Sequence, residues 1–369
     1  MNATPDPRWT SHVTAPSYSA PVAGRHPVRR SLLGLVSAAS LAFLAACGNG
    51  DSGSGDEAAA SGNGCDELTD VAVQFGWHPN VENMATIVAE QNGYFEDECL
   101  NVDILPGGPE VTADAQIVSG NADMGILSSE ALANAVINEA PLVGIGVTYQ
   151  NSPSVIVSLA EAGIEEPADL EGRTFGVSQT DLRVYEPFFA SVGVDWDAVE
   201  MVDTGADPAA LVSGEVDAMS AVSANQPVVL RNQGHEVNEI PLADYDYNRW
   251  SGALVVRQDS LEDPERREII MAMARAIERG LETAVEDPQA AGAIVFDAYA
   301  SDLGLEEATQ LEGAEVWASL TTADERESGL LLIDEAGVES QQEFFDNTGV
   351  DVDASAIFDL DASQEAFGD

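Results

Sequence analysis

Residues 71–105 read VAVQFGWHPNVENMATIVAEQNGYFEDECLNVDIL, and this stretch decides the fold. Apolar residues first form the short run 71–76, then recur at helical spacing over about 81–90, and then form a second short run over 100–105. A strand, a helix and a strand in this order make a βαβ unit, in which the two strands run parallel. The chain is therefore expected to fold as an α/β protein.

The same alternation continues toward the C-terminus. Further strands are expected at 124–127, 142–148, 155–159, 174–177, 199–203, 218–222 and 252–256. Helices are expected near 110–119, 130–138, 182–191, 207–213, 226–233, 264–285, 288–299, 305–319 and 324–345. This rhythm predicts mainly parallel sheets that helices cover on both faces. The last residues, 346–369, are acidic and weakly patterned, and we expect them to form a tail.

The composition limits the possible functions. The 369 residues hold 65 acidic side chains against 14 basic ones, all of them arginine, so the formal net charge is −51. A chain this negative repels phosphate backbones, which excludes nucleic acid as a partner. The absence of lysine also removes Schiff-base chemistry and the lysine of a P-loop. We interpret the acidic, lysine-free surface as an adaptation to high salt, because net charge governs solubility rather than fold.

The N-terminal segment 1–46 has the character of a signal peptide. Four arginines precede the apolar run 31–46, which is too short to span a bilayer comfortably. The sequence LAACG at 44–48 looks like a bacterial lipobox, so Cys47 is predicted to be acylated and to anchor the protein on the outer face of the cell membrane. Both the general and the twin-arginine export routes stay open. Residues 47–65, rich in Gly, Ser and Asp, are predicted to be a flexible linker.

Two further cysteines, Cys65 and Cys99, lie just before the strand-like runs 71–76 and 100–105. If those strands are parallel neighbours, both thiols lie at the same end of the sheet. An exported chain meets an oxidising environment, which favours a disulfide between them. Two separate thiols are the alternative, because a sequence does not give the distance between two Cα atoms.

The order of the motifs resembles a known family. The segments FGWHPN (75–80) and GYFEDECLNV (93–102) resemble the pattern W-x-P-N … G-Y-F-x-x-E-G-L-x-V of periplasmic solute-binding proteins, in the superfamily that binds thiamine pyrimidine precursors, riboflavin, nitrate, sulfonates and taurine. Further matches follow in register over about residues 68–300, at PGG (106–108), GNADMG (120–125), YQNSP (149–153), PADLEGRTFGV (167–177), LVSGEVDA (211–218), RG (279–280) and DP (287–288). Cys99 departs from the pattern, which has glycine there, and this suggests that a turn residue was exchanged for the disulfide.

The resemblance implies the type II periplasmic-binding-protein fold, with two doubly wound α/β domains joined by a two-crossing hinge. Domain I would hold residues 66–152 and 250–345, and domain II would hold residues 153–249. The crossings 149–153 and 247–252 would form the hinge. The protein would be a monomer without a cofactor, and it would close around a small-molecule ligand and deliver it to the permease and ATPase subunits of an ABC importer.

In open α/β sheets, ligands bind beyond the carboxyl ends of the strands. Trp77 follows the first strand at such an end. The turn-forming residues after it favour a ring that lines the cleft and stacks on a flat ligand over a ring packed in the core. The other candidates are polar or aromatic residues at strand ends, helix starts and crossings, and for several of them helix capping is the alternative role. They are Asn80, Asn83, Ser128, Ser129, Tyr149, Gln150, Ser178, Gln179, Thr180, Asn225, Tyr247 and Trp250.

These aromatic and amide groups suit a neutral heteroaromatic ring, so the predicted ligand is like a thiamine pyrimidine precursor or riboflavin. Nitrate, a sulfonate or taurine is the alternative, and such an anion would need cationic or dense N–H coordination. Between Trp77 and Trp250 only Arg183 and Arg249 are placed to supply a cation. An ion pair with one of the many acids is the simpler role for either arginine.

Enzyme functions find little support in the sequence. The part beyond the signal peptide has two histidines, His78 and His235, and no H-E-x-x-H or G-x-S-x-G motif. The superfamily that the sequence resembles also includes a pyrimidine synthase. That enzyme holds pyridoxal phosphate on a lysine, and this chain has no lysine. The acidic run 351–355 lacks the glycine of an EF-hand loop, so no metal site is predicted. A surface lipoprotein without a transport role is a third interpretation, but it leaves the two βαβ series unexplained.

Overall fold

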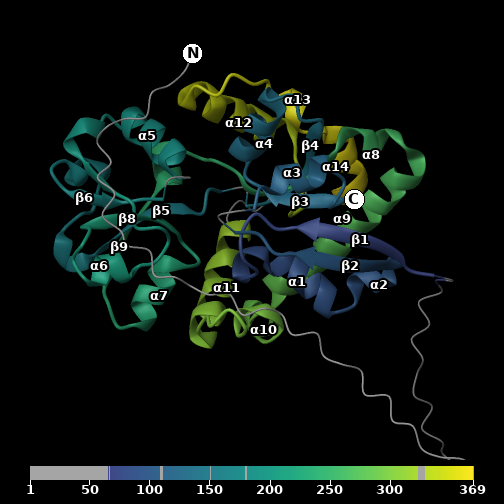
Figure 1. The fold of residues 1–369 in the computed structure, drawn as a ribbon, viewed down its shortest axis with the longest axis horizontal. Coiled ribbons are helices and arrows are strands. Elements are labelled where there is room, and N and C mark those ends of the chain that lie inside the picture. Colours follow the sequence, from purple (N-terminus) through teal and green to yellow (C-terminus); the bar gives the residue numbers. More distant parts are fainter. Residues whose placement is uncertain are drawn as a thin grey trace, which may run out of the picture. The chain divides into compact units, whose positions relative to one another are not determined.

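The computed structural model describes residues 65, 67–108, 111–149, 151–178, 181–322 and 329–368, with Arg183 described by its backbone alone. The expected signal peptide, Cys47 and nearly all of the expected linker lie outside these residues, as do Gln150, Gln179 and Thr180. Within the described ranges no helix is both long and apolar enough to cross a membrane. The described strands gather into two five-stranded sheets (Figure 1).

The first sheet, called sheet A, has the strand order β2-β1-β3-β10-β4. Its strands are β1 (Thr69–Gln74), β2 (Leu100–Leu105), β3 (Met124–Leu127), β4 (Leu142–Tyr149) and β10 (Ser251–Arg257). Strand β1 pairs in parallel with β2 and β3, whereas β10 runs antiparallel to β3 and β4. Strands β1 to β4 therefore all end at one edge of sheet A, which we call its carboxyl edge.

Two groups of helices bury the two faces of sheet A. One group consists of α1 (Met84–Gln91), α2 (Tyr94–Asp97), α9 (Pro264–Glu286), α10 (Pro288–Val295), a π-helical turn (Phe296–Ala300), α11 (Glu307–Thr322) and α14 (Leu360–Phe367). The other group consists of α3 (Ala113–Val118), α4 (Ser129–Ile137), α12 (Glu335–Thr348) and α13 (Ala354–Ile357), while α8 (Gln258–Glu262) links β10 to α9. The amphipathic pattern predicted α9 to within a residue, and its apolar face packs on α1. At their closest approach only glycine fits, since a Cβ on Gly280 would lie 2.1 Å from the carbonyl oxygen of Ala85.

The second sheet, sheet B, has the strand order β7-β6-β8-β5-β9. Its strands are β5 (Ser154–Leu159), β6 (Thr174–Gly176), β7 (Glu200–Val202), β8 (Ala218–Val222) and β9 (Val237–Pro241). They are connected by α5 (Leu182–Ser191), α6 (Ala209–Val212), α7 (Gln226–Asn232) and the 3-10 turns Ala160–Ala162, Pro167–Leu170, Trp196–Ala198 and Leu242–Tyr245. Strand β6 pairs in parallel with β7 and β8, and β5 runs antiparallel to β8 and β9. The sequence did not predict β9, because this edge strand is polar and ends in proline, which only an edge strand accommodates easily.

The chain passes from sheet A to sheet B between β4 and β5 and returns between the turn after β9 and β10. The two crossings are joined to each other, because the backbone N–H of Ser152 donates to Oδ1 of Asn248 over 2.7 Å. Gln341, fully buried in α12, holds the returning strand from the other side: its amide donates to the carbonyl oxygen of Asn248 and accepts from the N–H of Trp250. Strands β5 and β10 each follow a crossing directly, and each runs against the other four strands of its sheet. Both sheets are therefore mixed, with four of the five strands in each running parallel.

The expectation of a weakly patterned tail at 346–369 was wrong. Residues 354–367 form α13 and α14, and Phe358 and Phe367 between and within them are buried. Both rings fill space that two glycines of β4 leave open: a Cβ on Gly144 would lie 2.7 Å from the ring of Phe358, and one on Gly146 would lie 2.6 Å from that of Phe367. The helix expected at 324–345 likewise begins only at Glu335 within the described residues.

Cys65 and Cys99 form a disulfide, with their Cα atoms 5.6 Å apart. The bond lies at the amino edge of sheet A, because Thr69 and Leu100 begin a parallel pair and Thr69 donates its N–H to the carbonyl oxygen of Cys99. Cys99 has a φ of 63°, in the left-handed region that favours glycine. This explains why the pattern of related sequences has glycine at this turn.

We expect reduction of the disulfide to lower the free energy of unfolding by about 2–4 kcal/mol, because the open chain regains the entropy of a loop that spans 34 residues. Ligand affinity should not change, since the bond lies at the edge opposite the strand ends. Thermal unfolding with and without reductant measures the effect, and the double variant Cys65→Ser/Cys99→Ser is the control that reductant should not alter. Identical melting in both conditions would contradict the prediction.

Each arginine whose side chain the structure describes pairs with at least one carboxylate. The pairs are Arg173–Asp217, Arg231–Glu239, Arg231–Glu312, Arg249–Glu130, Arg257–Asp259, Arg266–Asp123, Arg267–Glu365, Arg275–Glu98, Arg275–Glu268 and Arg279–Asp97. Most of these pairs are solvent-exposed and contribute little individually. The large excess of acids therefore leaves the protein with strong self-repulsion.

We expect the melting temperature to rise by several degrees between about 0.1 M and about 2 M KCl, because the screening length falls from about 10 Å at 0.1 M to about 3 Å at 1 M. Thermal unfolding across this series measures the effect. Sucrose at equal osmolality is the control, since it stabilises by exclusion from the surface without screening charge. A flat or falling melting temperature in KCl would show that charge repulsion does not limit stability.

Candidate functional site

Trp77 lies just past the carboxyl end of β1 and is 37% exposed, although most large apolar side chains of the described residues are buried. Its ring is tilted against that of His78, with 5.2 Å between the ring centroids. A large aromatic ring left open at the carboxyl edge of a sheet is suited to stack on a flat ligand. Trp77 is thus open at the carboxyl edge of sheet A, and its role in lining a ligand cleft stays a prediction.

The loop after β2 holds the Trp77 loop in place. Gly107 donates its N–H to the carbonyl oxygen of Trp77 over 3.0 Å. The two loops approach so closely that a Cβ on Gly107 would lie 2.3 Å from the carbonyl oxygen of Phe75. Below them, the buried amide of Gln74 donates to the carbonyl oxygens of Phe75, Leu105 and Pro106. The P-G-G motif thus fixes the backbone that presents the indole.

A carboxylate, Glu82, lies next to this loop in the 3-10 turn Val81–Asn83 that precedes α1. Its Oε1 accepts two hydrogen bonds of 3.2 Å, one from Nδ2 of Asn80 and one from Nδ2 of Asn225. Asn225 follows β8 of sheet B, so this second bond connects the carboxyl edges of the two sheets. Burial raises the pKa of Glu82; the hydrogen bonds from Asn80 and Asn225 lower it in part, and the charge of Asp181 raises it further.

Tyr149 and Asn83 bring buried polar atoms to the same region. Tyr149, at the carboxyl end of β4, is 3% exposed, and its ring meets that of Trp317 edge-on with centroids 5.8 Å apart. Its hydroxyl finds no hydrogen-bond partner among the described residues, and neither does Oδ1 of the buried Asn83. Burial and the charge of Glu82 both raise the pKa of Tyr149, so the phenol stays protonated and able to donate.

Some of the asparagines and serines of the predicted site cap a helix, and others bond elsewhere. Asn80 caps the 3-10 turn through its Oδ1, Ser128 caps α4 through Oγ, and Ser178 bonds both the N–H and the carboxylate of Asp181. Asn83 and Asn225 stand at helix starts but make no side-chain cap bond. Capping therefore accounts for Asn80 and Ser128, whereas Ser178 bonds Asp181, the N-cap residue of α5, and the amide of Asn225 donates to Glu82.

Three of the predicted site residues lie in the core instead. Tyr247 packs edge-on against Phe344 of α12 and donates its hydroxyl to the carbonyl oxygen of Val184 over 2.7 Å. Trp250 is 1% exposed and packs on Phe358. Ser129 is fully buried behind it and donates its N–H to the carbonyl oxygen of Trp250. The C-terminal helices cover all three, and the sequence did not reveal that covering.

Sequence reasoning missed Glu82 and underrated Arg249. The sequence did hold a signal for Glu82, because a charged residue stands there between apolar Val81 and the buried face of α1. Arg249 lies in the returning crossing, where its Nη2 donates to Oγ of Ser154 over 3.2 Å and its Nη1 lies 3.7 Å from the carboxylate of Glu130. Its Nε is buried and has no partner among the described residues.

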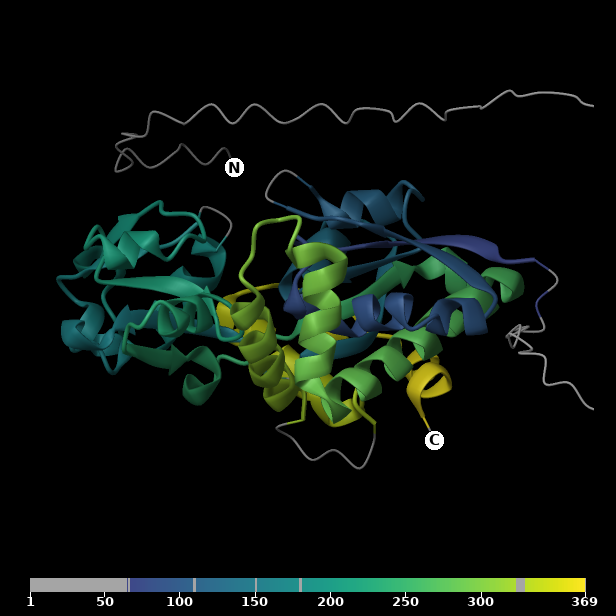
Figure 2. The same ribbon diagram turned by 90° about the horizontal axis from the view of Figure 1, so that it is seen from below.

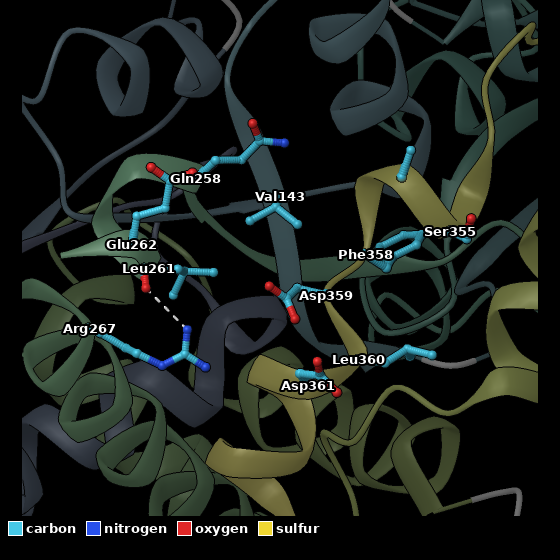
Figure 3. Close-up of a pocket in the computed structure, with 11 residues that line it drawn as sticks. Val143, Gln258, Leu261, Glu262, Arg267, Ser355, Phe358, Asp359, Leu360 and Asp361 are labelled. Atoms are coloured by element: carbon cyan, nitrogen blue, oxygen red, sulfur yellow. Dashed lines mark hydrogen bonds between the residues drawn. The ribbon is translucent and has the colours of Figure 1, made fainter. Parts of the chain in front are cut away.

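A cavity of about 550 Å³ lies elsewhere on sheet A (Figure 3). Val143 at the start of β4 and Gln258 after β10 line it, so it opens at the amino edge, away from Trp77 and Glu82. Arg267 in its wall donates to the carbonyl oxygen of Leu261 and is paired with Glu365. No group of three or more potential metal ligands occurs among the residues the structure describes.

Comparison with known proteins gives a consistent result. The family described as NMT1/THI5 like matches residues 80–291. The formylaminopyrimidine-binding protein of Halalkalibacterium halodurans is 29% identical over 260 residues, which are 68% of this chain and 74% of that protein. The riboflavin-binding protein RibY of Chloroflexus aurantiacus is 24% identical over 279 residues, which are 72% of this chain and 78% of that protein.

The fold is shared with solved binding proteins. The periplasmic aliphatic sulphonate-binding protein SsuA from Escherichia coli superposes with a TM-score of 0.58 at 12% identity, over 81% of this chain and 92% of that one. The predicted periplasmic-binding-protein fold is thereby confirmed. One similar protein has the name of an enzyme: the 4-amino-5-hydroxymethyl-2-methylpyrimidine phosphate synthase of Legionella pneumophila is 22% identical over 60% of this chain and 71% of that protein.

Proposed function

Because the chain belongs to the NMT1/THI5-like family, we propose that it is the solute-binding protein of an ABC importer and that it captures a small heteroaromatic metabolite. The ligand is of the kind that its relatives' names give, a formylated aminopyrimidine or riboflavin. Lipid-anchored through Cys47 outside the membrane, the protein passes this ligand to the permease.

The single observation that supports an aromatic ligand is the open indole of Trp77 at the carboxyl edge of sheet A. Stacking on it needs a flat partner, and the amide and phenol groups nearby supply hydrogen bonds that orient such a ring. Arginines, which an inorganic anion would need, are paired with carboxylates wherever the structure describes their side chains.

Sheets A and B form two domains in this proposal, and the crossings at 149–153 and 247–252 form the hinge. The hydrogen bond between the crossings and the clamp by Gln341 support a hinge that bends as one unit. The bond from Asn225 to Glu82 is a contact that closure would make and opening would break. Ligand capture then shifts the population toward the closed state that the permease recognises.

A second candidate ligand is an anion such as a sulfonate, and Arg249 is the observation that favours it. Its side chain is 17% exposed and its Nε lacks a partner among the described residues. Glu130, itself 14% exposed, offsets most of this positive charge, which makes the anion the weaker candidate.

An enzymatic role is not part of the proposal. The chain has no lysine to hold pyridoxal phosphate, and the polar groups at the carboxyl edge hydrogen-bond or stack rather than form a nucleophile and base pair. The name of the Legionella relative belongs to that protein.

Mass spectrometry of small molecules released from the freshly purified protein by denaturation tests the proposal. We expect an aminopyrimidine or a flavin in near-stoichiometric amount, and none from an unrelated exported protein purified in the same way. Recovery of only a sulfonate or nitrate would overturn the heteroaromatic ligand and favour the site at Arg249.

A further inference from the structure

We propose that Arg231, Glu312 and Gly313 form a latch that holds the two sheets in the closed arrangement, and that they set the apparent ligand affinity without touching the ligand. They are positioning residues for ligand capture. This inference rests on the proposed function and concerns the control of closure at that same site. It also assigns the opposite side of the molecule, at α12, as the pivot.

Helix α11 is the element on which the latch is built. It covers sheet A together with α10, and it also packs against α7, which connects β8 to β9 of sheet B. Figure 2 shows α11 in yellow-green between α10 and the elements of sheet B. Ala224, in the turn that leads into α7, is 1% exposed and lies in the same buried cluster as Val81 and Trp317. A residue that follows a strand of sheet B is thus buried against the helices of sheet A.

Arg231, in the last turn of α7, supplies the charged part of the latch. Its Nε lies 2.9 Å from Oε1 of Glu312 in α11, and its Nη1 pairs with Glu239 on the neighbouring strand β9. One guanidinium therefore stands between a carboxylate of sheet B and a carboxylate of α11. In a protein whose formal net charge is −51, its removal would leave two acids close together with no cation between them.

Gly313, the next residue of α11, supplies the steric part. A Cβ at this position would lie 2.5 Å from the carbonyl oxygen of Ala224 and 3.1 Å from Cγ2 of Val81. The first of these atoms belongs to the backbone of the turn before α7, so it cannot rotate away. A methyl group at Gly313 would hold α11 and this turn apart, although alanine is otherwise the better residue for a helix interior.

The α12 side is joined by apolar rings instead. Tyr247, in the returning crossing, packs edge-on against Phe344 of α12 and against Phe188 of α5, with ring centroids 5.1 Å and 5.3 Å apart. Its hydroxyl also donates to the carbonyl oxygen of Val184 in α5. All three rings are at most 3% exposed, and they belong to one buried cluster that includes residues of both sheets.

The two sides differ in how easily they separate. Parting the buried rings would expose apolar surface to water, whereas the side chains of Arg231 and Glu312 are 34% and 35% exposed and exchange their ion pair for solvent at little cost. Opening therefore begins at α11 and turns about α12. A ligand that binds the closed arrangement must supply whatever free energy the latch does not, so a weaker latch lowers the apparent affinity.

Isothermal titration calorimetry with 4-amino-5-hydroxymethyl-2-methylpyrimidine, the aminopyrimidine, tests the latch through ligand affinity. We expect Glu312→Gln to weaken binding about 2- to 5-fold and Gly313→Ala to weaken it about 5-fold or more. Glu315→Gln is the matched control, because Glu315 lies in the same helix and accepts a hydrogen bond from Gln289 of α10. Its affinity should stay within about 1.5-fold of the wild type. The melting temperature of each variant verifies that it is folded.

Arg231→Gln gives a readout that a merely structural role would not move. In this variant the Glu312 carboxylate is repelled by Glu239 and no longer attracted by Arg231. Adding Glu312→Gln to it should therefore restore part of the affinity, whereas the same change weakens binding in the wild type. KCl at about 2 M should abolish both charge effects by screening, and it should leave the effect of Gly313→Ala in place.

Distances between paired spin labels, measured by electron paramagnetic resonance, test the geometry without any ligand. Labels at Asn232→Cys and Ser319→Cys span the α11 side, and labels at Glu186→Cys and Glu339→Cys span the α12 side; all four positions are exposed. We expect Gly313→Ala to lengthen the distance on the α11 side and to leave the distance on the α12 side unchanged.

The outcomes separate the latch from the ligand. If Gly313→Ala lengthens the α11-side distance but the wild type does not bind the aminopyrimidine, the latch stands and the proposed aminopyrimidine ligand fails. If the wild type binds it and folded Gly313→Ala keeps both the full affinity and the wild-type distances, the latch fails and the proposed function stands. Equal lengthening on both sides would also overturn the inference, because α12 would then not be the pivot.

Discussion

Trp250→Ala is expected to lower the free energy of unfolding by about 3–5 kcal/mol, the usual cost of removing a large buried aromatic ring. The indole is 1% exposed and packs against Phe358, with ring centroids 5.2 Å apart. A Cβ on Gly337 would lie 2.7 Å from the same ring, so α12 has been shaped to its surface. The truncated side chain would leave a cavity that these rigid neighbours cannot close.

Chemical denaturation of the wild type and of Trp250→Ala measures this loss. Ligand affinity of the folded variant should stay within about threefold, because the ring is 1% exposed and packs against Phe358. Trp77→Ala is the matched control, since it removes the same side chain from an exposed position. A change in unfolding free energy below about 1 kcal/mol, together with lost affinity, would return Trp250 to the ligand site.

Trp77→Ala should show the opposite behaviour, with ligand affinity lowered by one to three orders of magnitude and unfolding free energy changed by less than about 1 kcal/mol. Stacking of a base on an aromatic side chain contributes about 1–3 kcal/mol, and the ligand also loses apolar contact area at about 25 cal/mol per Å². The small effect on stability follows from the 37% exposure of the ring.

Titration of the aminopyrimidine into wild type, Trp77→Ala, Trp77→Phe and Trp77→Leu tests this expectation. Phenylalanine keeps a stacking face, so Trp77→Phe should recover most of the affinity that alanine loses. Unchanged affinity in Trp77→Ala would remove this residue from the site. A recovery of affinity by leucine equal to that by phenylalanine would show that bulk, rather than stacking, matters at this position.

The two tryptophans show how far sequence reasoning reached for the site. Trp77 follows β1 and Trp250 precedes β10, both at the carboxyl edge of sheet A. The sequence predicted that each of them lines the cleft. Trp77 lies in the exposed stretch 76–78, whereas Trp250 is covered by Phe358, 108 positions later in the chain, and by α12. Local sequence does not contain the information on what covers a ring.

Glu82 illustrates a different limit. Its neighbours in sequence suggested a helix start, and Asn80 was considered as a cap, which it is. The partner that gives the carboxylate its character is Asn225, in the other sheet and 143 positions away. Such a contact forms only where the carboxyl edges of sheets A and B meet. No periodic pattern in the sequence predicts it.

The sequence by itself determined the succession of strands and helices around both sheets, the extent of α9, the family, and the position of Cys65 and Cys99 at one end of neighbouring strands. Apolar periodicity and turn residues act over a few positions, so the elements that depend on them can be predicted from the sequence alone. Only the tertiary structure decided that β9 completes sheet B, that the acidic C-terminus folds onto Gly144 and Gly146, and that Trp250 is core while Trp77 is open. Those outcomes depend on which distant surfaces bury one another, and burial is a property of the packed chain rather than of any segment of it.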